Sequence, residues 1–188
     1  MRLPTPIVVV SRCLGFDHCR YDGEIVRADV VSRIAGHVRA IPVCPELEIG
    51  LGVPRSPIRI VRDGKSDRLL QPESGRDLTA DMDAFAARFL EWMGEKGVDG
   101  FIVKSRSPSC GSGDSRVFAA SGDELADQAD GLFVRVARKR FPEAIIEDES
   151  SLADAVTRHE FVTALYENAA RRLGRKLPRD WQYPADLS

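Results

Sequence analysis

The sequence lacks the features that place a chain in a membrane or on a secretory route. No apolar run approaches the roughly 18 residues that a membrane-spanning helix needs. Only four apolar residues follow the first prolines, which is too short for the core of a signal peptide. The formal net charge of −2 also gives no general electrostatic reason to bind nucleic acid. These absences predict a cytoplasmic globular protein with no membrane contact.

Cysteine and histidine are both scarce, with four and three copies in 188 residues. Four cysteines are too few for a disulfide scaffold at this length, and cytoplasmic thiols are more often metal ligands or catalysts than disulfide partners. No Cys-x-x-Cys pair occurs, which argues against a zinc ribbon and a thioredoxin-type redox pair. His18 lies beside Cys19 and is a candidate ligand, but such histidines more often lie in a surface loop. A site must therefore be built mainly from thiols that the fold brings together.

Three of the cysteines share one setting, in which a short apolar run leads into a turn that carries the thiol. Cys13, Cys44 and Cys110 follow these runs, which cover residues 7–10, 39–43 and 100–104. Such runs predict buried parallel strands, and open α/β sheets bind ligands beyond the carboxyl ends of their strands. If the three strands are neighbours, the three thiols converge. Three thiols at a strand-end crevice predict a metal or iron–sulfur site with one position left open.

Helical stretches alternate with these strands. This alternation predicts an α/β fold: a Rossmann-like three-layer sandwich with a mainly parallel sheet, plus a C-terminal helix. The expected helices cover residues 27–38, 80–96, 132–141 and 152–173. Further strands are expected over residues 58–62, 68–71 and 144–147, the first two as a hairpin. We expect one domain over residues 1–150 and a helical extension over residues 151–188.

Two local expectations concern helix starts. Thr79 is expected to be the N-cap of the second helix, because threonine at that position accepts backbone N–H groups of the first turn. The stretch 117–131 is expected to be either a loop or a helix capped by Ser121 or Asp123.

Four segments form a distinctive series: residues 11–14 with 19–23, 42–46 with 50–55, 75–79, and 104–111. They read Ser-Arg-Cys-Leu with Cys-Arg-Tyr-Asp-Gly, Pro-Val-Cys-Pro-Glu with Gly-Leu-Gly-Val-Pro-Arg, Gly-Arg-Asp-Leu-Thr, and Lys-Ser-Arg-Ser-Pro-Ser-Cys-Gly. The series resembles the thiouracil desulfidase family, long catalogued as a domain of unknown function, over about residues 5–150. One segment alone would be a weak match, whereas four in the right order are specific. Some two-domain relatives act on thiolated uridine in tRNA, and residues 151–188 resemble at most the linker helix before that second domain.

The resemblance implies a [4Fe–4S] cluster held by Cys13, Cys44 and Cys110, with the fourth iron left unligated by protein. Cys19 matches a position that some relatives fill with another residue, so it stays outside the ligand set. The implied reaction is a non-redox hydrolysis in which the open iron polarises a thiocarbonyl group and water attacks its carbon. The products are a uracil-type pyrimidine and hydrogen sulfide. The substrate would be a thiolated pyrimidine, and thiouracil, thiouridine and thiouridine in tRNA all stay open.

The resemblance also implies catalytic residues. Glu46, two residues past the second cysteine, is expected to activate water, although a carboxylate there alone would more often stabilise a helix N-terminus. Ser107 resembles a family serine that hydrogen-bonds substrate or relays a proton, and its position equally suits a loop or N-cap serine. Arg55 and Tyr21 are candidates to contact the pyrimidine or a phosphate, and Ser109 is expected to support the turn.

Two other functions stay open from the sequence. One is a cluster-free sulfur-transfer or redox enzyme that works through a single cysteine thiolate of low pKa. The other is a metal- or RNA-binding module, for which the C-terminal region offers basic groups at residues 138–140, 171–172, 175–176 and 179. A solvated helix face is the more common reason for such charges.

Overall fold

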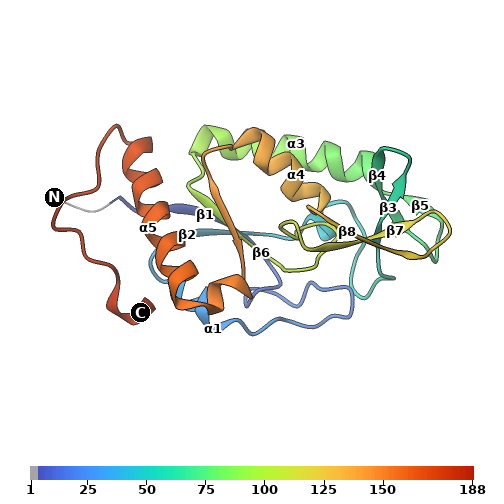
Figure 1. Cartoon of the computed structure of the whole chain (residues 1–188), viewed down its shortest axis with the longest axis horizontal. Helices are drawn as coiled ribbons and strands as arrows, with labels where there is room; N and C mark the ends of the chain where they lie inside the picture. Colours follow the sequence, from blue (N-terminus) through green and yellow to red (C-terminus); the bar gives the residue numbers. More distant parts are fainter. Residues whose placement is uncertain (1–3) are drawn as a thin grey trace.

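A computed structural model describes residues 4–188, and a four-stranded parallel sheet forms the core of the fold (Figure 1). In spatial order its strands are β2 (Arg39–Val43), β1 (Ile7–Ser11), β6 (Gly100–Val103) and β9 (Ile145–Asp148). All three neighbouring pairs run parallel. The four strands expected here are confirmed to within one residue at either end. The three strands that precede the cysteines are therefore neighbours.

The central strands are apolar along their whole length because both faces of the sheet are covered. Every residue of β1 and β6 is buried. Val9 and Phe101 pack in one hydrophobic core, while Val8 and Ile102 pack in a second core on the opposite face. Successive side chains of a strand point to opposite faces, so each strand contributes to both cores.

Helices cover both faces and complete the three layers. On one face lie α3 (Thr79–Lys96) and α4 (Leu132–Arg140), packed side by side, and on the other lie α1 (Asp29–Ala35) and α5 (Ala155–Arg172). A four-residue helix, α2 (Pro45–Glu48), follows β2 directly. Each expected helix is present. The predicted α/β sandwich with a C-terminal helix is confirmed.

A second sheet of five strands continues along the long axis of the molecule (Figure 1). In spatial order its strands are β5 (Arg76–Asp77), β4 (Ser66–Gln71), β3 (Arg59–Asp63), β7 (Ser115–Ala119) and β8 (Glu124–Ala129). The expected hairpin is confirmed as β3 and β4, which pair antiparallel. Only the β3–β7 pair in this sheet is parallel.

The stretch 117–131 is neither a loop nor a helix capped by Ser121 or Asp123, so that prediction was wrong. It contributes most of the β7–β8 hairpin, in which Ser121 Oγ donates to Asp123 Oδ2 at 2.8 Å inside the connecting turn. Gly122 takes a φ of 96°, which suits a tight turn and would break a helix. Val117 is fully buried because β7 pairs with β3, a partner far away along the chain.

The N-cap of α3 also differs from the prediction. Leu78 occupies the cap position, and Thr79 is the first helical residue. Thr79 Oγ1 accepts the Leu69 N–H at 2.9 Å, so the neighbouring hairpin engages the hydroxyl that was expected to cap the helix. Asp77 Oδ1 instead accepts the Thr79 N–H at 3.0 Å. Hydrogen bonds from Thr79, together with Arg68, lower the pKa of Asp77 to about 2.

A buried carboxylate fastens the C-terminal helix to the sheet. Asp99, 1% exposed, lies just before β6 and accepts the Ile7 N–H at 2.7 Å. It also accepts from Nε and Nη2 of Arg172, the last residue of α5, at 3.0 and 2.9 Å. Short 3-10 helices, Ser151–Ala153 and Ala185–Leu187, lie on either side of α5 in the chain.

None of the helices described within residues 4–188 has the length and apolarity that crossing a bilayer requires. The division at residue 150 stays a prediction. Phe161 and Leu165 of α5 are fully buried and share a hydrophobic core with Val8 of β1.

We expect Asp99→Ala to lower the free energy of unfolding by about 2–4 kcal/mol, because it removes a buried charged acceptor and leaves the Ile7 N–H unpaired. Urea unfolding monitored by circular dichroism measures the change. Glu143→Gln is the matched control, since Glu143 contacts Arg171 at 3.7 Å and both side chains are exposed. We expect that control to stay within about 0.5 kcal/mol of the wild type. Equal losses in the two variants would contradict the role of Asp99.

Candidate active site

The carboxyl ends of β1, β2 and β6 meet at one edge of the sheet, beside a cavity of about 460 Å³. Ser11 and Val43, the last residues of β1 and β2, are partners in the strand register. Cys13 and Cys44 follow them closely, and Cys110 comes from the turn after β6. All three thiols line the cavity. The structure thus brings together three cysteines that are far apart in the sequence.

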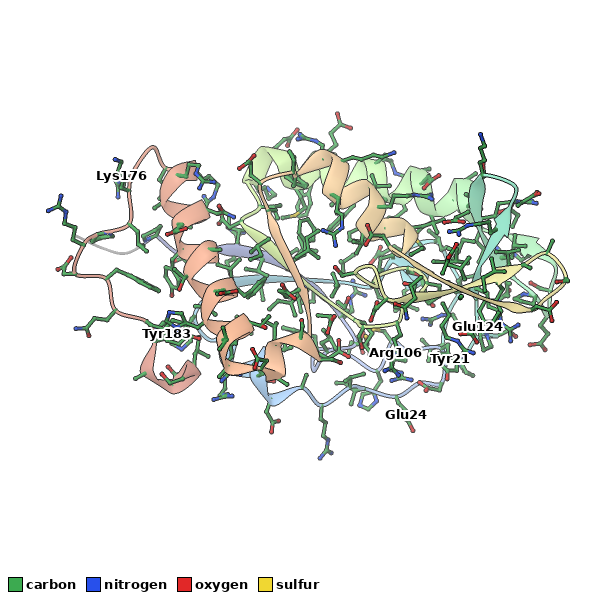
Figure 2. The ribbon with its side chains drawn as sticks, viewed as in Figure 1. Tyr21, Glu24, Arg106, Glu124, Lys176 and Tyr183 are labelled. Atoms are coloured by element: carbon green, nitrogen blue, oxygen red, sulfur yellow. The ribbon has the colours of Figure 1, made fainter. Side chains whose placement is uncertain are left out.

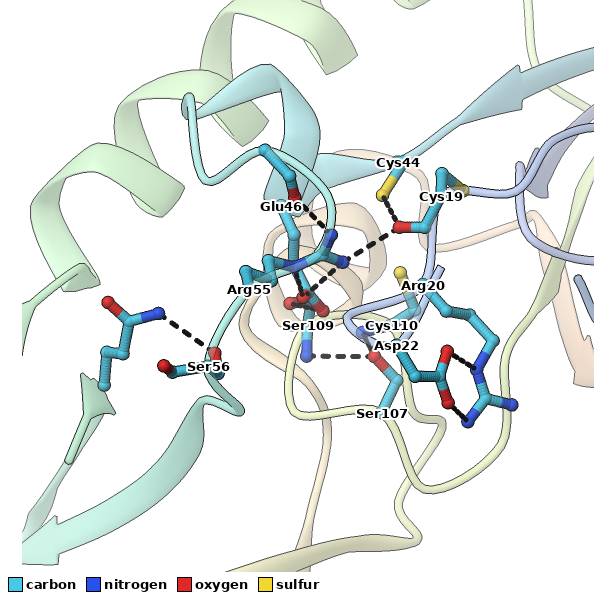
Figure 3. A network of polar contacts seen from close by, with 12 residues as sticks. Cys19, Arg20, Asp22, Cys44, Glu46, Arg55, Ser56, Ser107, Ser109 and Cys110 are labelled. Atoms are coloured by element: carbon cyan, nitrogen blue, oxygen red, sulfur yellow. Dashed lines mark hydrogen bonds and ion pairs between the residues drawn. The ribbon is translucent and has the colours of Figure 1, made fainter. Parts of the chain in front are cut away.

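Cys19, which the sequence left outside the ligand set, is a fourth thiol of this cavity. It is 1% exposed, and its thiol interacts with those of Cys13 and Cys44. Its carbonyl oxygen accepts from Cys44 Sγ at 3.7 Å (Figure 3). His18, the histidine singled out from the sequence, contacts the Gly23 carbonyl and does not line the cavity.

The turn that carries Cys110 is fixed from two sides. Ser107 Oγ accepts the N–H groups of Ser109 and Cys110 at 3.3 and 3.1 Å, as a capping serine does. From the other side, the Gly131 N–H donates to the Gly111 carbonyl at 2.8 Å, and the next two N–H groups of α4 bind carbonyls of the same turn. The first N–H groups of a helix have no acceptor within that helix. At the start of α4 these groups bind the Cys110 turn instead and hold it in place.

Three of the four thiols have raised pKa values. Hydrogen bonding to Cys13, with burial, raises the pKa of Cys19 to about 11. Hydrogen bonding to Cys19, with burial, raises the pKa of Cys44, and burial, with the nearby charges of Cys44 and Glu46, raises that of Cys110. A reactive thiolate needs the opposite shift, so these surroundings disfavour Cys19, Cys44 and Cys110 as nucleophiles that work without a metal.

The donor set suits an iron–sulfur cluster. Thiolate sulfur is the usual ligand of such clusters, and a bound metal ion deprotonates the thiols that coordinate it. The positive charge of iron would offset the cost of several buried thiolates at one place. In the part of the chain that the structure describes, no three His, Cys, Asp or Glu side chains are arranged to hold a single metal ion.

Glu46, the predicted base, lines the cavity from the first turn of α2. Its Oε2 lies 2.8 Å from Nε and 2.7 Å from Nη2 of Arg55, and its Oε1 accepts from Ser109 Oγ at 2.9 Å (Figure 3). The side chain of Glu46 is 14% exposed and that of Arg55 is 4% exposed. The carboxylate is thus held by two nearly buried partners, and the sequence had assigned neither of them this role.

The other candidates also border the cavity. Ser107 lines it, and since its oxygen already accepts two backbone N–H groups, its hydroxyl proton is the part that can bind a ligand. Tyr21, 43% exposed, and Arg106 line its outer part and lie close together in Figure 2. Lys176, one of the basic residues of the C-terminal region, lies towards the opposite end of the molecule in the same view.

The sequence missed an ion pair in the cavity wall. Lys104 Nζ contacts Glu149 Oε1 at 2.5 Å, and Ser105 donates to both Glu149 oxygens through its hydroxyl and its N–H. Burial alone would raise the pKa of Glu149, but the donors of Lys104 and Ser105 outweigh it and lower the pKa. The signal was available, because Lys104 follows β6 and Glu149 follows β9 at the same sheet edge.

Comparison with known proteins agrees with the geometry. The 2-thiouracil desulfurase family model matches residues 8–149. The chain belongs to this family. The matched residues include all four cysteines together with Glu46, so the family resemblance predicted from the four motifs is confirmed.

Two known proteins are similar to this chain. It is 34% identical over 112 residues to the uncharacterized protein YbbK of Bacillus subtilis (strain 168), which covers 57% of this chain and 74% of YbbK. It is also similar to a solved structure of the [4Fe–4S]-dependent thiouracil desulfidase TudS, with a TM-score of 0.64 and 28% identity. That match covers 86% of this chain and 98% of the TudS chain.

We expect Gly131→Ala to disturb the Cys110 turn of this desulfurase family member. A Cβ at Gly131 would lie 2.4 Å from the carbonyl carbon of Ser109 and 2.6 Å from the Cys110 nitrogen, and this backbone cannot yield easily. The stability loss should be about 1–3 kcal/mol, with faster reaction of Cys110 towards a thiol reagent. Gly94→Ala is the control, since its Cβ would meet only the flexible end of Arg140. Unchanged stability and thiol reactivity in Gly131→Ala would show that α4 does not hold the turn.

Proposed function

We propose that this chain removes sulfur from a thiolated pyrimidine by hydrolysis at a [4Fe–4S] cluster held by Cys13, Cys44 and Cys110. The observation that carries the proposal is the meeting of these thiols in one cavity with Glu46, within a family of thiouracil desulfurases. The similarity to TudS, a [4Fe–4S]-dependent desulfidase, supports the choice of cofactor.

With these three cysteines as its protein ligands, the cluster would keep one iron without a protein ligand. When bound, the cluster would supply an open, Lewis-acidic iron for the soft sulfur of a thiocarbonyl group. Cys13 is the most exposed of the four thiols, while the other three are buried. We keep Cys19 outside the ligand set, as a neighbour of two ligands.

The Glu46 carboxylate is the proposed general base. Arg55 places two nitrogens against Oε2, one of them in a hydrogen bond, whereas Oε1 receives a single donor from Ser109, so a position on Oε1 stays free to take a proton from water. Ser107 would donate a hydrogen bond from its hydroxyl group to the pyrimidine. Water supplies the oxygen that replaces sulfur and both protons of hydrogen sulfide, so the reaction needs no net electron transfer.

The size of the cavity supports a small substrate. A volume of about 460 Å³ lies in the range of about 300–1,000 Å³ that is usual for small-molecule sites. We therefore propose a free or nucleoside thiopyrimidine as the substrate, with thiouridine in tRNA as the alternative. Thiol ligands need a reducing compartment, which supports a cytoplasmic location.

The two other functions receive less support. The raised pKa values of Cys19, Cys44 and Cys110 oppose a cluster-free enzyme that would use one of these three thiols as its thiolate. Several basic groups of the C-terminal region are paired with carboxylates rather than free for RNA, since Arg138 contacts Asp130 and Arg172 contacts Asp99.

The ligand assignment predicts a pattern of iron loss. We expect Cys13→Ser, Cys44→Ser and Cys110→Ser to retain little iron after anaerobic reconstitution, because each loses a thiolate ligand. Cys19→Ser should keep the wild-type iron content. Iron and acid-labile sulfide per chain measure the outcome. Loss of the cluster in Cys19→Ser would require a different ligand set.

The catalytic assignment predicts that loss of the base lowers turnover without loss of the cluster. The reconstituted wild type should release sulfide and uracil from 2-thiouracil, or the corresponding products from 4-thiouridine. Glu46→Gln should keep its iron but lose about 100- to 10,000-fold in kcat, because the amide cannot take a proton from water. Sulfide release per cluster measures the turnover of the wild type and of the variant. Wild-type rates in Glu46→Gln would remove Glu46 from the mechanism, and no sulfide from either substrate with an intact cluster would contradict the proposed function.

A further inference from the structure

Arg55 lies beside Glu46 in the cavity wall and binds two other segments of the chain as well as a carbonyl of its own loop. Its side chain is 4% exposed. Nε and Nη2 contact Glu46 Oε2 at 2.8 and 2.7 Å. Nη1 donates to the Gly52 carbonyl at 2.8 Å, and Nη2 donates to the Cys19 carbonyl at 3.0 Å. These contacts fix the plane of the guanidinium group and, through it, one oxygen of the carboxylate (Figure 3).

Glu46 is held from the other side by Ser109. The Ser109 hydroxyl donates to Oε1 at 2.9 Å, and Ser109 is fully buried next to Cys110. Oε2 therefore receives its donors from Arg55, and Oε1 receives one donor and keeps an acceptor position. The two partners together define which oxygen of the carboxylate can accept a proton.

We propose that Arg55 is a positioning residue for desulfidation, which holds the Glu46 carboxylate so that Oε1 takes the proton of the attacking water. The inference rests on the proposed function of Glu46 as the base. Arg55 acts through Glu46 and not on the substrate. A nearly buried side chain that is already bound to two carbonyls has little freedom to move towards a ligand.

The planar, forked arrangement of the Arg55 N–H donors matters more for positioning Glu46 than the positive charge does. Lysine carries its three N–H donors on one nitrogen, so it cannot reach Glu46, Gly52 and Cys19 in the present geometry. Arg55→Lys therefore keeps the positive charge but releases the carboxylate. A purely structural role would instead affect folding or cluster content, and the two roles can be separated by a double-mutant cycle with Glu46→Gln.

The cycle compares the wild type, Arg55→Lys, Glu46→Gln and the double variant, each reconstituted anaerobically and assayed for sulfide release per cluster. We expect Arg55→Lys to lose about 10- to 100-fold in kcat with unchanged KM and iron content. In the Glu46→Gln background the same substitution should have no further effect, because no base is left to position. Arg62→Lys is the matched control, since Arg62 makes a similar fork with Asp67, at 2.8 and 3.1 Å, outside the cavity. It should keep the wild-type kcat.

Two results would overturn the inference while leaving the proposed function intact. One is an equal loss from Arg55→Lys with and without Glu46, which would mean that the two residues act independently. The other is lost iron with an unchanged kcat per cluster, which would mean that Arg55 only supports the site. If Arg55→Lys does not fold, Arg55→Gln enters the same cycle with the same expectations. An inactive wild type with an intact cluster would overturn the proposed function and the inference together.

Discussion

Parallel pairing of β1 with both β2 and β6 is the constraint on which the site depends. Parallel neighbours end at the same edge of a sheet, so residues that follow these strands are delivered to one place. Burial on both faces keeps β1 in the middle, because four of its five residues contribute to two hydrophobic cores. An antiparallel neighbour would carry its cysteine to the opposite edge. The convergence of thiols is thus a consequence of hydrophobic burial and strand direction before any metal is considered.

The turns beyond the strand ends owe their shape to hydrogen bonds with other segments. The start of α4 holds the Cys110 turn, and Ser109 of that turn donates to Glu46 on α2. Arg55 joins the same carboxylate to the Cys19 carbonyl. The thiols and the proposed base therefore share one hydrogen-bonded framework. Binding of a cluster by these turns would fix the base, and loss of the framework would affect both.

The sequence predicted the parallel strands and the cysteine convergence because buried strands appear as continuous apolar runs. It could not predict the β7–β8 hairpin, since Val117 is stabilised by pairing opposite Ile60 in a distant strand. Thr79 has the residue type of an N-cap, but in the fold its hydroxyl accepts the Leu69 N–H of the neighbouring hairpin. Glu46 could be singled out from its spacing to a cysteine and from the family motif, but its partners could not. Those partners lie 9 and 63 residues away, at distances that only the folded chain makes short.

In the proposed function, Cys13, Cys44 and Cys110 hold a [4Fe–4S] cluster at this edge of the sheet. The most direct test is the iron and acid-labile sulfide content per chain after anaerobic reconstitution. We expect about four of each, with the absorption of a [4Fe–4S] centre. Little iron, with all four thiols free to react, would contradict it and bring the cluster-free functions back into consideration.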